Sequence, residues 1–355
     1  MQAPIFDYMT KYRYKKVVLC QNAGVGLRAV IAIHSTTLGP ATGGTRMWTY
    51  PSETDAILDA MRLARGMTYK YAAAGVDLGG GKCVIIGDPK TQKSEGLLRA
   101  LGRFVQSLGG EFQTGEDVGT TLDDMEILAA ECNYIVTLPE HAGGAGPIAP
   151  ATAFGVLQAM KACCREVYGD ESLRGRRVTL QGLGAVGSEM LKLLLKEGAD
   201  VVATDIDPDK VDWARASGAH GVAPDAIYRE ACDIFCPCAL GGILNDVVIP
   251  ELKCRIVCGS ANNQLWEERH GDELHRRGIF YAPDYVANAG GTIFDTDRLR
   301  KGGFNRERAM QNVARIGQTM ERLIALSKHE GIPTYVAADR LAEERLATKE
   351  KVRLI

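Results

Sequence analysis

The sequence predicts an α/β fold with two domains, and three observations support this prediction. The chain has 355 residues, about twice the ~150 residues of an average domain. One passage in its second half, residues 176–207, reads as strand, glycine turn, helix and strand, which is typical of a parallel α/β unit. Two segments before residue 120, at 39–48 and 64–90, hold more glycine and charge than a structural domain requires. We therefore expect the two halves of the chain to have different roles.

The composition argues against nucleic-acid and membrane partners. Lys plus Arg (42) nearly cancel Asp plus Glu (44), which leaves a formal net charge of −2, and no basic stripe is long enough to follow a phosphate backbone. No apolar run approaches the ~20 residues that cross a bilayer, and residues 1–16 lack the apolar core of a signal peptide. Forty glycines, about 11% of the chain, exceed the ~7% average and indicate several close approaches of backbone to ligand.

The ten cysteines are expected to be reduced structural thiols of a cytoplasmic protein. The chain is too long to need disulfides for its stability, and six cysteines lie in apolar runs: Cys20, Cys163, Cys164, Cys232, Cys254 and Cys258. Cys236 and Cys238 are one residue apart, but no second Cys or His pair has zinc-finger spacing. A metal or redox role is therefore the less favoured alternative, and we assign no metal ligand.

The clearest motif is GLGAVG at residues 182–187. It follows an apolar, β-branched strand at 178–181 and begins a segment whose apolar residues recur at helical spacing. Gly182 permits a tight turn, Gly184 lets a pyrophosphate approach the backbone, and Gly187 lets the helix pack against the strand. The N-terminus of the helix offers free N–H groups and a partial positive charge to phosphates. The motif therefore predicts a dinucleotide-binding Rossmann domain.

Asp205 indicates which dinucleotide to expect. It ends a second strand at 200–204, where a carboxylate accepts both ribose hydroxyls and repels a 2′-phosphate, so NAD is favoured over NADP. Later short apolar runs fit further parallel strands that alternate with helices, at 232–237, 255–258 and 278–281. Two loops rich in Asn and Gly, 258–263 and 283–291, would then lie with the glycine motif at the carboxyl ends of the strands, where ligands collect.

The first half of the chain supplies the candidate catalytic groups. Lys70 and Lys82 are twelve residues apart, each lies among apolar or small residues, and three glycines precede Lys82. Two ammonium groups in a partly dry cleft would lower the pKa of one, making it a general base, while the other holds a carboxylate. The alternative is that each lysine extends to solvent; the glycines weigh against it, because they are costly unless something must come close. Asp117 is a third candidate, with a helix cap or turn as its alternative role.

Along essentially the whole chain the sequence resembles the amino acid dehydrogenase family that contains the leucine, valine and phenylalanine enzymes. The matching stretches are GPATGGTRM, LARGMTYK, GVDLGGGKCVIIGDP, EDVGTT, PATAFGV, LQGLGAVG, DIFCPCALGG, GSANNQL and APDYVANAGG. The runs REACDIFCPCALGG and GSANNQLWEERHG look most like phenylalanine dehydrogenases.

The resemblance implies the reversible oxidative deamination of an L-amino acid to a 2-oxo acid and ammonia, with NAD accepting the hydride. It makes Lys82 the general base that activates water, Asp117 the group that exchanges protons with the departing amine, and Lys70 the ligand of the substrate α-carboxylate. It places four more residues around the substrate: Gly43, Gly44, Met67 and Asn263. Besides the three motif glycines and Asp205, it implies cofactor contacts at Leu183, Ala185, Val186, Ile206, Thr152, Cys238, Ala239, Ala261, Asn262 and Asn288.

The family fold has two domains around a deep cleft. By resemblance, residues 1–140 plus 325–355 form an α/β domain for substrate binding, catalysis and oligomerisation, and residues 141–324 form the Rossmann domain. The helical pattern from Arg306 to His329, ended by Gly331 and Pro333, fits a chain that returns to the first domain. Members of the family form dimers to octamers, so a homo-oligomer is expected.

The resemblance is loosest at the substrate side chain. The family's side-chain pocket is apolar, and such a pocket discriminates by volume at ~1–3 kcal/mol per methylene. Thr42 stands where relatives usually carry Leu or Met, Gly115 where leucine-type enzymes carry Ala, and Thr292 and Asp295 where relatives are apolar. We expect a roomier, more polar pocket that accepts phenylalanine or another large side chain, with leucine, valine, tryptophan or a more polar amino acid as alternatives. Asp295 either faces the substrate or points to solvent.

Two other classes of protein carry similar cofactor motifs. A 2-hydroxyacid or alcohol dehydrogenase usually relies on a His–carboxylate relay, and none of the six histidines has a comparable glycine-framed setting. A non-catalytic NAD-binding regulator would have no reason to keep Lys70, Lys82 and Asp117 together. A requirement for ammonium in the reverse reaction separates the first class from an amino acid dehydrogenase, and loss of turnover on replacing Lys82 separates the second.

Overall fold

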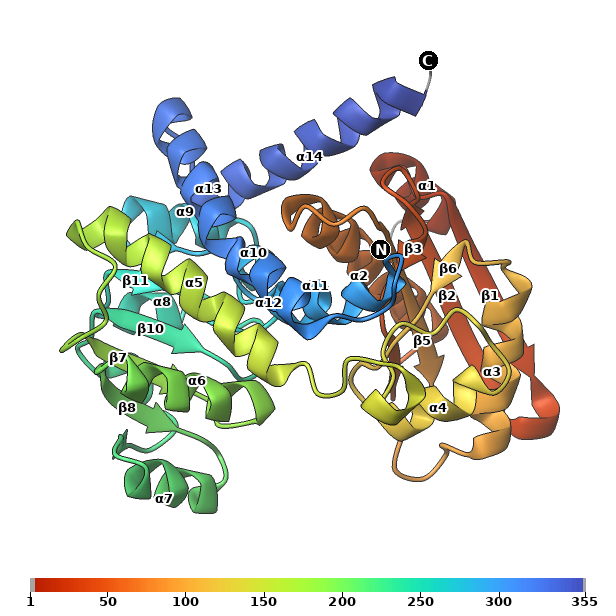
Figure 1. Cartoon of the computed structure of the whole chain (residues 1–355), viewed down its shortest axis with the longest axis horizontal. Helices are drawn as coiled ribbons and strands as arrows, with labels where there is room; N and C mark the ends of the chain where they lie inside the picture. The colour runs from red at the N-terminus through yellow and green to blue at the C-terminus, as the bar shows by residue number, and fades with distance from the viewer. Residues whose placement is uncertain (1–3, 354–355) are drawn as a thin grey trace. The chain divides into compact units, whose positions relative to one another are not determined.

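The computed structural model describes residues 4–353, and the chain divides into two compact units (Figure 1). Unit 1 comprises Met1–Gly146, Asp295–Asn305 and Ala342–Ile355, and unit 2 comprises Pro147–Phe294 and Arg306–Leu341. These bounds differ from the expected 1–140 plus 325–355 and 141–324. The chain returns late because helices α12 (Arg306–Ala314) and α13 (Ile316–Glu330) both pack on α5 (Ala149–Tyr168) of unit 2. Gly331, with a φ of 65°, ends α13.

Unit 1 contains a mixed six-stranded sheet. Its strands are β1 (Lys16–Asn22), β2 (Leu27–Ser35), β3 (Ala41–Thr42), β4 (Thr45–Trp48), β5 (Gly79–Ile86) and β6 (Phe112–Gln113). β1, β2 and β5 pair antiparallel, whereas β3 and β4 pair parallel with β5, and β6 pairs parallel with β3. β3 pairs with the start of β5 and β4 with its end. The break between β3 and β4, at Gly43 and Gly44, therefore lies beside the middle of β5.

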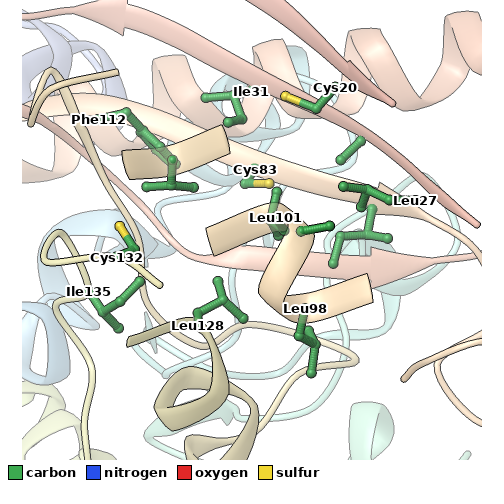
Figure 2. Packing of buried hydrophobic residues seen from close by; sticks show 14 of the residues in the cluster. Cys20, Leu27, Ile31, Cys83, Leu98, Leu101, Phe112, Leu128, Cys132 and Ile135 are labelled. Carbon is green, nitrogen blue, oxygen red and sulfur yellow. The ribbon is translucent and has the colours of Figure 1, made fainter. Parts of the chain in front are cut away.

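Helices cover both faces of this sheet. They are α1 (Ile5–Tyr12), α2 (Glu53–Ala73), α3 (Glu95–Ser107) and α4 (Leu122–Ala129). Side chains alternate along a strand, so Ile31 and Cys83 point into one core, which α3 and α4 complete with Leu98 and Leu128 (Figure 2). Val84 points the other way and packs in a cluster with residues of α2. Side chains two positions from Val84 along β5 point to the same side, which is the face of the sheet that α2 covers.

Unit 2 contains six parallel strands in the order β12–β11–β10–β7–β8–β9. The strands are β7 (Arg177–Gln181), β8 (Asp200–Thr204), β9 (His220–Gly221), β10 (Ile234–Pro237), β11 (Ile256–Val257) and β12 (Phe280–Tyr281). Every strand expected in this half coincides with one of these, and only β9 was not anticipated. The parallel order brings the carboxyl ends of β7, β8, β10, β11 and β12 to one edge of the sheet.

The helices of this half alternate with the strands. After α5 they are α6 (Ala185–Lys196), α7 (Pro208–Ala216), α8 (Val248–Glu251), α9 (Arg269–Arg276) and α10 (Asp284–Ala287). α11 (Gly290–Thr296) and α14 (Thr334–Arg353) continue from unit 2 into unit 1. Single 3₁₀ turns are η1 (Ala23–Val25), η2 (Glu140–Ala142), η3 (Ile227–Arg229) and η4 (Asp297–Leu299). Residues of α8 and α9 share a core cluster with β8, β10, β11 and β12, while α5 and α6 contact the sheet outside that cluster.

All ten cysteines are free thiols. Eight are buried, and Cys232 and Cys238 are partly buried; Figure 2 shows Cys20, Cys83 and Cys132 inside the unit 1 core. Across residues 4–353, no three His, Cys, Asp or Glu side chains gather as metal ligands would. Over the same described range, no helix combines the length and the apolarity that spanning a bilayer demands.

Candidate active site

Lys82 lies in the middle of β5, two residues before Val84, so its side chain is on the α2 face. It is only 6% exposed. The glycines before it are explained by packing: a Cβ on Gly80 would lie 2.2 Å from the backbone nitrogen of Thr68 on α2, and a Cβ on Gly79 would lie 2.1 Å from the carbonyl oxygen of Ser35. A Cβ on Gly81 would lie 2.7 Å from the ring of Phe112. The close approach predicted from these glycines is therefore made by the protein itself.

Asp117 is brought to Lys82 by the loop that follows β6. This loop runs beside β4, because the N–H of Thr45 donates to the carbonyl oxygen of Gly115. The Lys82 Nζ lies 2.6 Å from Oδ2 of Asp117. The hydroxyl of Thr120 accepts from the N–H of Asp117 and donates to the carbonyl oxygen of Thr45. The structure therefore joins two of the three candidate catalytic residues, Lys82 and Asp117, in an ion pair that the sequence had not indicated.

Two cations hold Asp117 as a carboxylate. Besides Lys82, Arg46 donates from Nε to the same Oδ2 at 3.2 Å. Burial by itself would raise the pKa of Asp117, but Lys82 and Arg46 outweigh it and lower that pKa to about 2. Arg46 is oriented in turn by Asp59, at 3.2 Å, and Tyr50 donates to the same Asp59 oxygen at 2.5 Å.

The break between β3 and β4 lies against both β5, which carries Lys82, and the loop that carries Asp117. A Cβ on Gly43 would lie 1.9 Å from the carbonyl oxygen of Gly81 and 3.3 Å from Cγ of Met67. A Cβ on Gly44 would lie 2.8 Å from Cβ of Asp117. Met67 therefore lies near the Gly43–Gly44 backbone, beside the strand that carries Lys82. Lys70 follows Met67 by three residues on α2, which puts the two side chains on the same face of that helix.

The expected side-chain pocket residues have a different arrangement from the one the sequence indicated. Thr42 is buried in β3, and its hydroxyl lies 3.3 Å from the carbonyl oxygen of Pro40. Gly115 does not leave free room, because a Cβ there would lie 2.1 Å from Oγ1 of Thr137. Thr137 donates to Oδ2 of Asp295 at 2.7 Å, and Asp295 is 5% exposed. The interpretation in which Asp295 points to solvent is therefore wrong. Thr292 lies on α11, three residues before Asp295.

In unit 2 the three motif glycines meet three different requirements. Gly182 has a φ of 93°, which strains any residue with a Cβ, and a Cβ on Gly187 would lie 1.9 Å from the carbonyl oxygen of Gly182. At Gly184, which caps α6, an added Cβ would have no atom of residues 4–353 within 4 Å apart from those of its chain neighbours. The structure thus leaves open space beside the helix N-terminus, where a phosphate group fits. Leu183 is buried, Val186 is half-buried, and Ala185 at the first position of α6 is exposed.

Asp205 lies directly after β8, next to the glycine turn. Its Oδ2 accepts from the N–H of Leu183 at 2.6 Å, and its Oδ1 accepts from the N–H of Asp207 at 2.9 Å. Each carboxylate oxygen has a second lone pair, so the held carboxylate can still accept ribose hydroxyls. Ile206 beside it is 91% exposed, which provides an apolar surface that suits a flat base.

The other expected cofactor residues follow the ends of neighbouring strands. Cys238 and Ala239 come directly after β10, and a Cβ on Gly182 would lie 2.9 Å from Cβ of Ala239. In the loop after β11, Ala261 is buried and Asn262 and Asn263 are exposed. Asn288 donates to Oδ1 of Asn262 at 2.9 Å, and its own buried Oδ1 has no hydrogen-bond partner among the residues that the structure describes. Thr152 on α5 lies against Gly291, whose Cβ would be 2.4 Å from Oγ1 of Thr152. These residues fit a dinucleotide at this edge of the sheet.

Sequence reasoning missed three residues of the site: Arg46, Asp59 and Thr137. Arg46 had a signal, because it is a charged residue within the glycine-rich segment 39–48 and lies on a short strand between buried neighbours. No sequence signal marked Asp59 or Thr137, because acidic residues on helices and threonines in loops are common in all proteins. Their roles depend on partners 13 and 158 residues away.

Comparisons with known proteins show which family the chain is similar to. Residues 15–134 match the family model described as "Glu/Leu/Phe/Val dehydrogenase, dimerisation domain", and residues 143–207 and 209–352 match "Glutamate/Leucine/Phenylalanine/Valine dehydrogenase". A leucine dehydrogenase from Thermoactinomyces intermedius is 54% identical over 350 residues, which cover 98% of this chain and 95% of that protein. A valine dehydrogenase from Streptomyces coelicolor is 49% identical over 338 residues, 94% of this chain and 92% of that protein. The crystal structure of an L-tryptophan dehydrogenase from Nostoc punctiforme, 42% identical, superposes with a TM-score of 0.86 over 98% of this chain and 100% of that one.

Proposed function

The chain belongs to the glutamate/leucine/phenylalanine/valine dehydrogenase family and is an amino acid dehydrogenase, and from this premise we propose that it deaminates an L-amino acid reversibly to a 2-oxo acid and ammonia, with NAD as the hydride acceptor. The observation that carries the proposal is the buried pair of Lys82 and Asp117, whose charged atoms lie 2.6 Å apart. A pair at this distance exchanges a proton directly, and general acid–base work in deamination needs such an exchange.

The roles of the pair follow from the proton balance of the reaction. Proton transfer from Lys82 to Asp117 gives a neutral amine beside a carboxylic acid. The amine of Lys82 takes the proton of the water that attacks the substrate iminium carbon, and Asp117 gives its proton to the departing amino group. Arg46 keeps Asp117 in position throughout. Lys70, with the Gly43–Gly44 backbone, is proposed to bind the substrate α-carboxylate, and Met67 to line the same site in unit 1; a contact of Asn263 with the substrate stays a prediction from the family resemblance.

The residues of unit 2 support NAD as the cofactor. When bound, NAD would accept the hydride from the substrate. The open space at Gly184 suits its pyrophosphate, and Asp205 would repel the additional phosphate of NADP. Asn262 and Asn288 are proposed to hold the carboxamide end, where the unpartnered oxygen of Asn288 accepts a hydrogen bond.

The expectation that phenylalanine is the main substrate is replaced by its alternative. Of the three similar proteins named above, the leucine and valine dehydrogenases are 54% and 49% identical and the tryptophan dehydrogenase is 42% identical, and Thr137 fills the space that was expected to open at Gly115. We therefore place the preferred side chain in the size range of valine and leucine. The match of residues 15–134 to a dimerisation domain supports a homo-oligomer, which light scattering of the purified chain would test.

Replacing Lys82 tests the proposal. We expect wild-type protein to reduce NAD with leucine or valine and to consume NADH with the 2-oxo acids only when ammonium is present. We expect Lys82→Ala to lose at least a hundredfold in kcat while NADH still binds, as measured by its fluorescence. Lys161→Ala is a matched control, because Lys161 is also paired with a partly buried acid, Glu197 at 2.8 Å, and it has no role in the proposed chemistry. Equal loss in both variants, or full activity of Lys82→Ala, contradicts the assignment.

A further inference from the structure

Only one of the two carboxyl oxygens of Asp295 accepts a hydrogen bond from the described residues. Its Oδ2 accepts from Thr137 at 2.7 Å, whereas its Oδ1 is buried without a hydrogen-bond partner among the described residues. Asp297, two residues later and 2% exposed, differs: it accepts from the N–H of Asn305 at 2.9 Å and lies 3.8 Å from Arg300. A buried acceptor without a hydrogen-bond partner costs free energy. A donor from a bound molecule would remove this cost at Oδ1 of Asp295.

The neighbouring cation does not supply that donor. Arg298, one helical turn after Asp295, donates from Nη1 to the carbonyl oxygens of Ile135 and Val136. Its charge acts on Asp295, but across the part of the chain that the structure describes no ion pair joins the two. Arg298 therefore partly balances the charge of Asp295 but gives Oδ1 no hydrogen bond.

Asp295 lies close to the elements that carry the proposed substrate site. The charge of Asp295 acts on Tyr71, the residue after Lys70, and the charge of Glu116, the residue before Asp117, acts on Asp295. Thr137, its hydrogen-bond donor, fills the space at Gly115. The unpartnered oxygen thus belongs to a buried group between the end of α2 and the loop that positions Asp117.

We propose that Oδ1 of Asp295 accepts a hydrogen bond from the side chain of the substrate, and that the substrates of this enzyme include amino acids of valine or leucine size whose side chains end in a neutral donor such as a hydroxyl or an amide. This inference rests on the proposed function, because it concerns the same site. A neutral donor is favoured over a cation, since Arg298 already balances part of the negative charge. Asp295 is then a residue that determines specificity, and an apolar residue at this position would reject such substrates.

Pairs of amino acids with the same shape test the inference. Threonine and valine, asparagine and leucine, and homoserine and norvaline differ mainly in the donor, so the ratio of kcat/KM within a pair isolates its effect. We expect Asp295→Val to lower the donor-to-apolar ratio about 10- to 100-fold relative to wild type in at least one pair, the range of a hydrogen bond to a charged group. Asp295→Asn, which turns the open acceptor into a donor, is expected to lower the ratio as well. Asp297→Asn is the matched buried control and should leave every ratio unchanged.

The outcomes separate this inference from the proposed function. Absence of NADH formation with all six amino acids contradicts the proposed function itself. Turnover of valine and leucine with ratios that do not change in Asp295→Val or Asp295→Asn overturns only the role of Asp295. If Asp295→Val does not fold, Asp295→Asn and the wild-type ratios decide: a wild-type preference for the apolar member above a hundredfold in every pair overturns the inference.

Discussion

The buried carboxyl of Asp295 should make the protein less stable as the pH rises through the range in which this group ionises. Burial is the main cause of the raised pKa of Asp295, which increases from 3.8 to about 6. The hydrogen bond from Thr137 and the charge of Arg298 lower the pKa, and Glu116 raises it. Because the folded state binds this proton more tightly than the unfolded state, ionisation of Asp295 costs stability.

The magnitude follows from the two pKa values. The difference between 3.8 and about 6 is about two units, and at ~1.4 kcal/mol per unit it corresponds to about 3 kcal/mol of stability lost once the pH exceeds 7. At pH 5 the loss is about 1.5 kcal/mol, and below pH 4 it is close to zero. Asp295→Asn cannot ionise, so its stability relative to wild type should increase by about 1.5 kcal/mol between pH 5 and pH 7.5.

Urea unfolding of both proteins at pH 5.0, 6.0 and 7.5, followed by circular dichroism, measures this change. Any constant effect of the amide cancels, because only the dependence of the difference on pH is compared. Thr137→Val is a useful second variant: without the hydrogen bond from Thr137 the pKa of folded Asp295 rises further, so the loss still begins near pH 4 but becomes larger and extends to higher pH. A difference between Asp295→Asn and wild type that is flat with pH, or that shrinks as the pH rises, refutes the reasoning.

Three further predictions concern the site and its support. Asp117→Asn should lose about a hundredfold or more in kcat; since the pKa of Asp117 is lowered from 3.8 to about 2, it should also lose about 2 kcal/mol of stability at pH 7, an effect that disappears only as the pH falls from about 4 to about 2. Gly115→Ala should destabilise the protein by about 1–3 kcal/mol in urea unfolding, because the new Cβ meets Oγ1 of Thr137 at 2.1 Å; an unchanged free energy of unfolding would show that Thr137 moves aside without cost. Asp205→Ser should raise the kcat/KM for NADP relative to NAD at least tenfold, since it removes the charge that repels a 2′-phosphate; an unchanged ratio would show that Asp205 does not select the cofactor.

The strands of unit 2 were predictable because their signals are local. The apolar runs at 178–181 and 200–204 coincide with β7 and β8, and the glycine motif between them fixes both the turn and the start of α6. A parallel strand that is buried on both faces needs a continuous apolar run, so the run itself identifies it. Two-residue β9 has no such run, and only its pairing with β8 makes it a strand.

The site in unit 1 was only partly predictable, because its geometry depends on pairing between distant segments. The residue types of Lys82 and Asp117 pointed to chemistry, and the structure joins them. The glycines before Lys82 were expected to permit a close approach, and the structure shows that α2 and the neighbouring strands make it. Arg46 reaches Asp117 only because β4 lies beside β5 and the loop after β6 lies beside β4, and no local pattern contains that order of strands.

The case of Asp295 shows where sequence reasoning must stop. From the sequence, an acid within TIFDTD fits both an exposed helical position and a buried one. The choice depends on Thr137, 158 residues away, which takes the space at Gly115 and offers its hydroxyl to the carboxyl group. With alanine at position 115 the side chain of Thr137 would have to move, and Asp295 would then lose its one protein donor. The residues Gly115, Thr137 and Asp295 therefore form one contact chain, and we expect the effect of Asp295→Val on substrate preference to change when Gly115 or Thr137 is replaced as well.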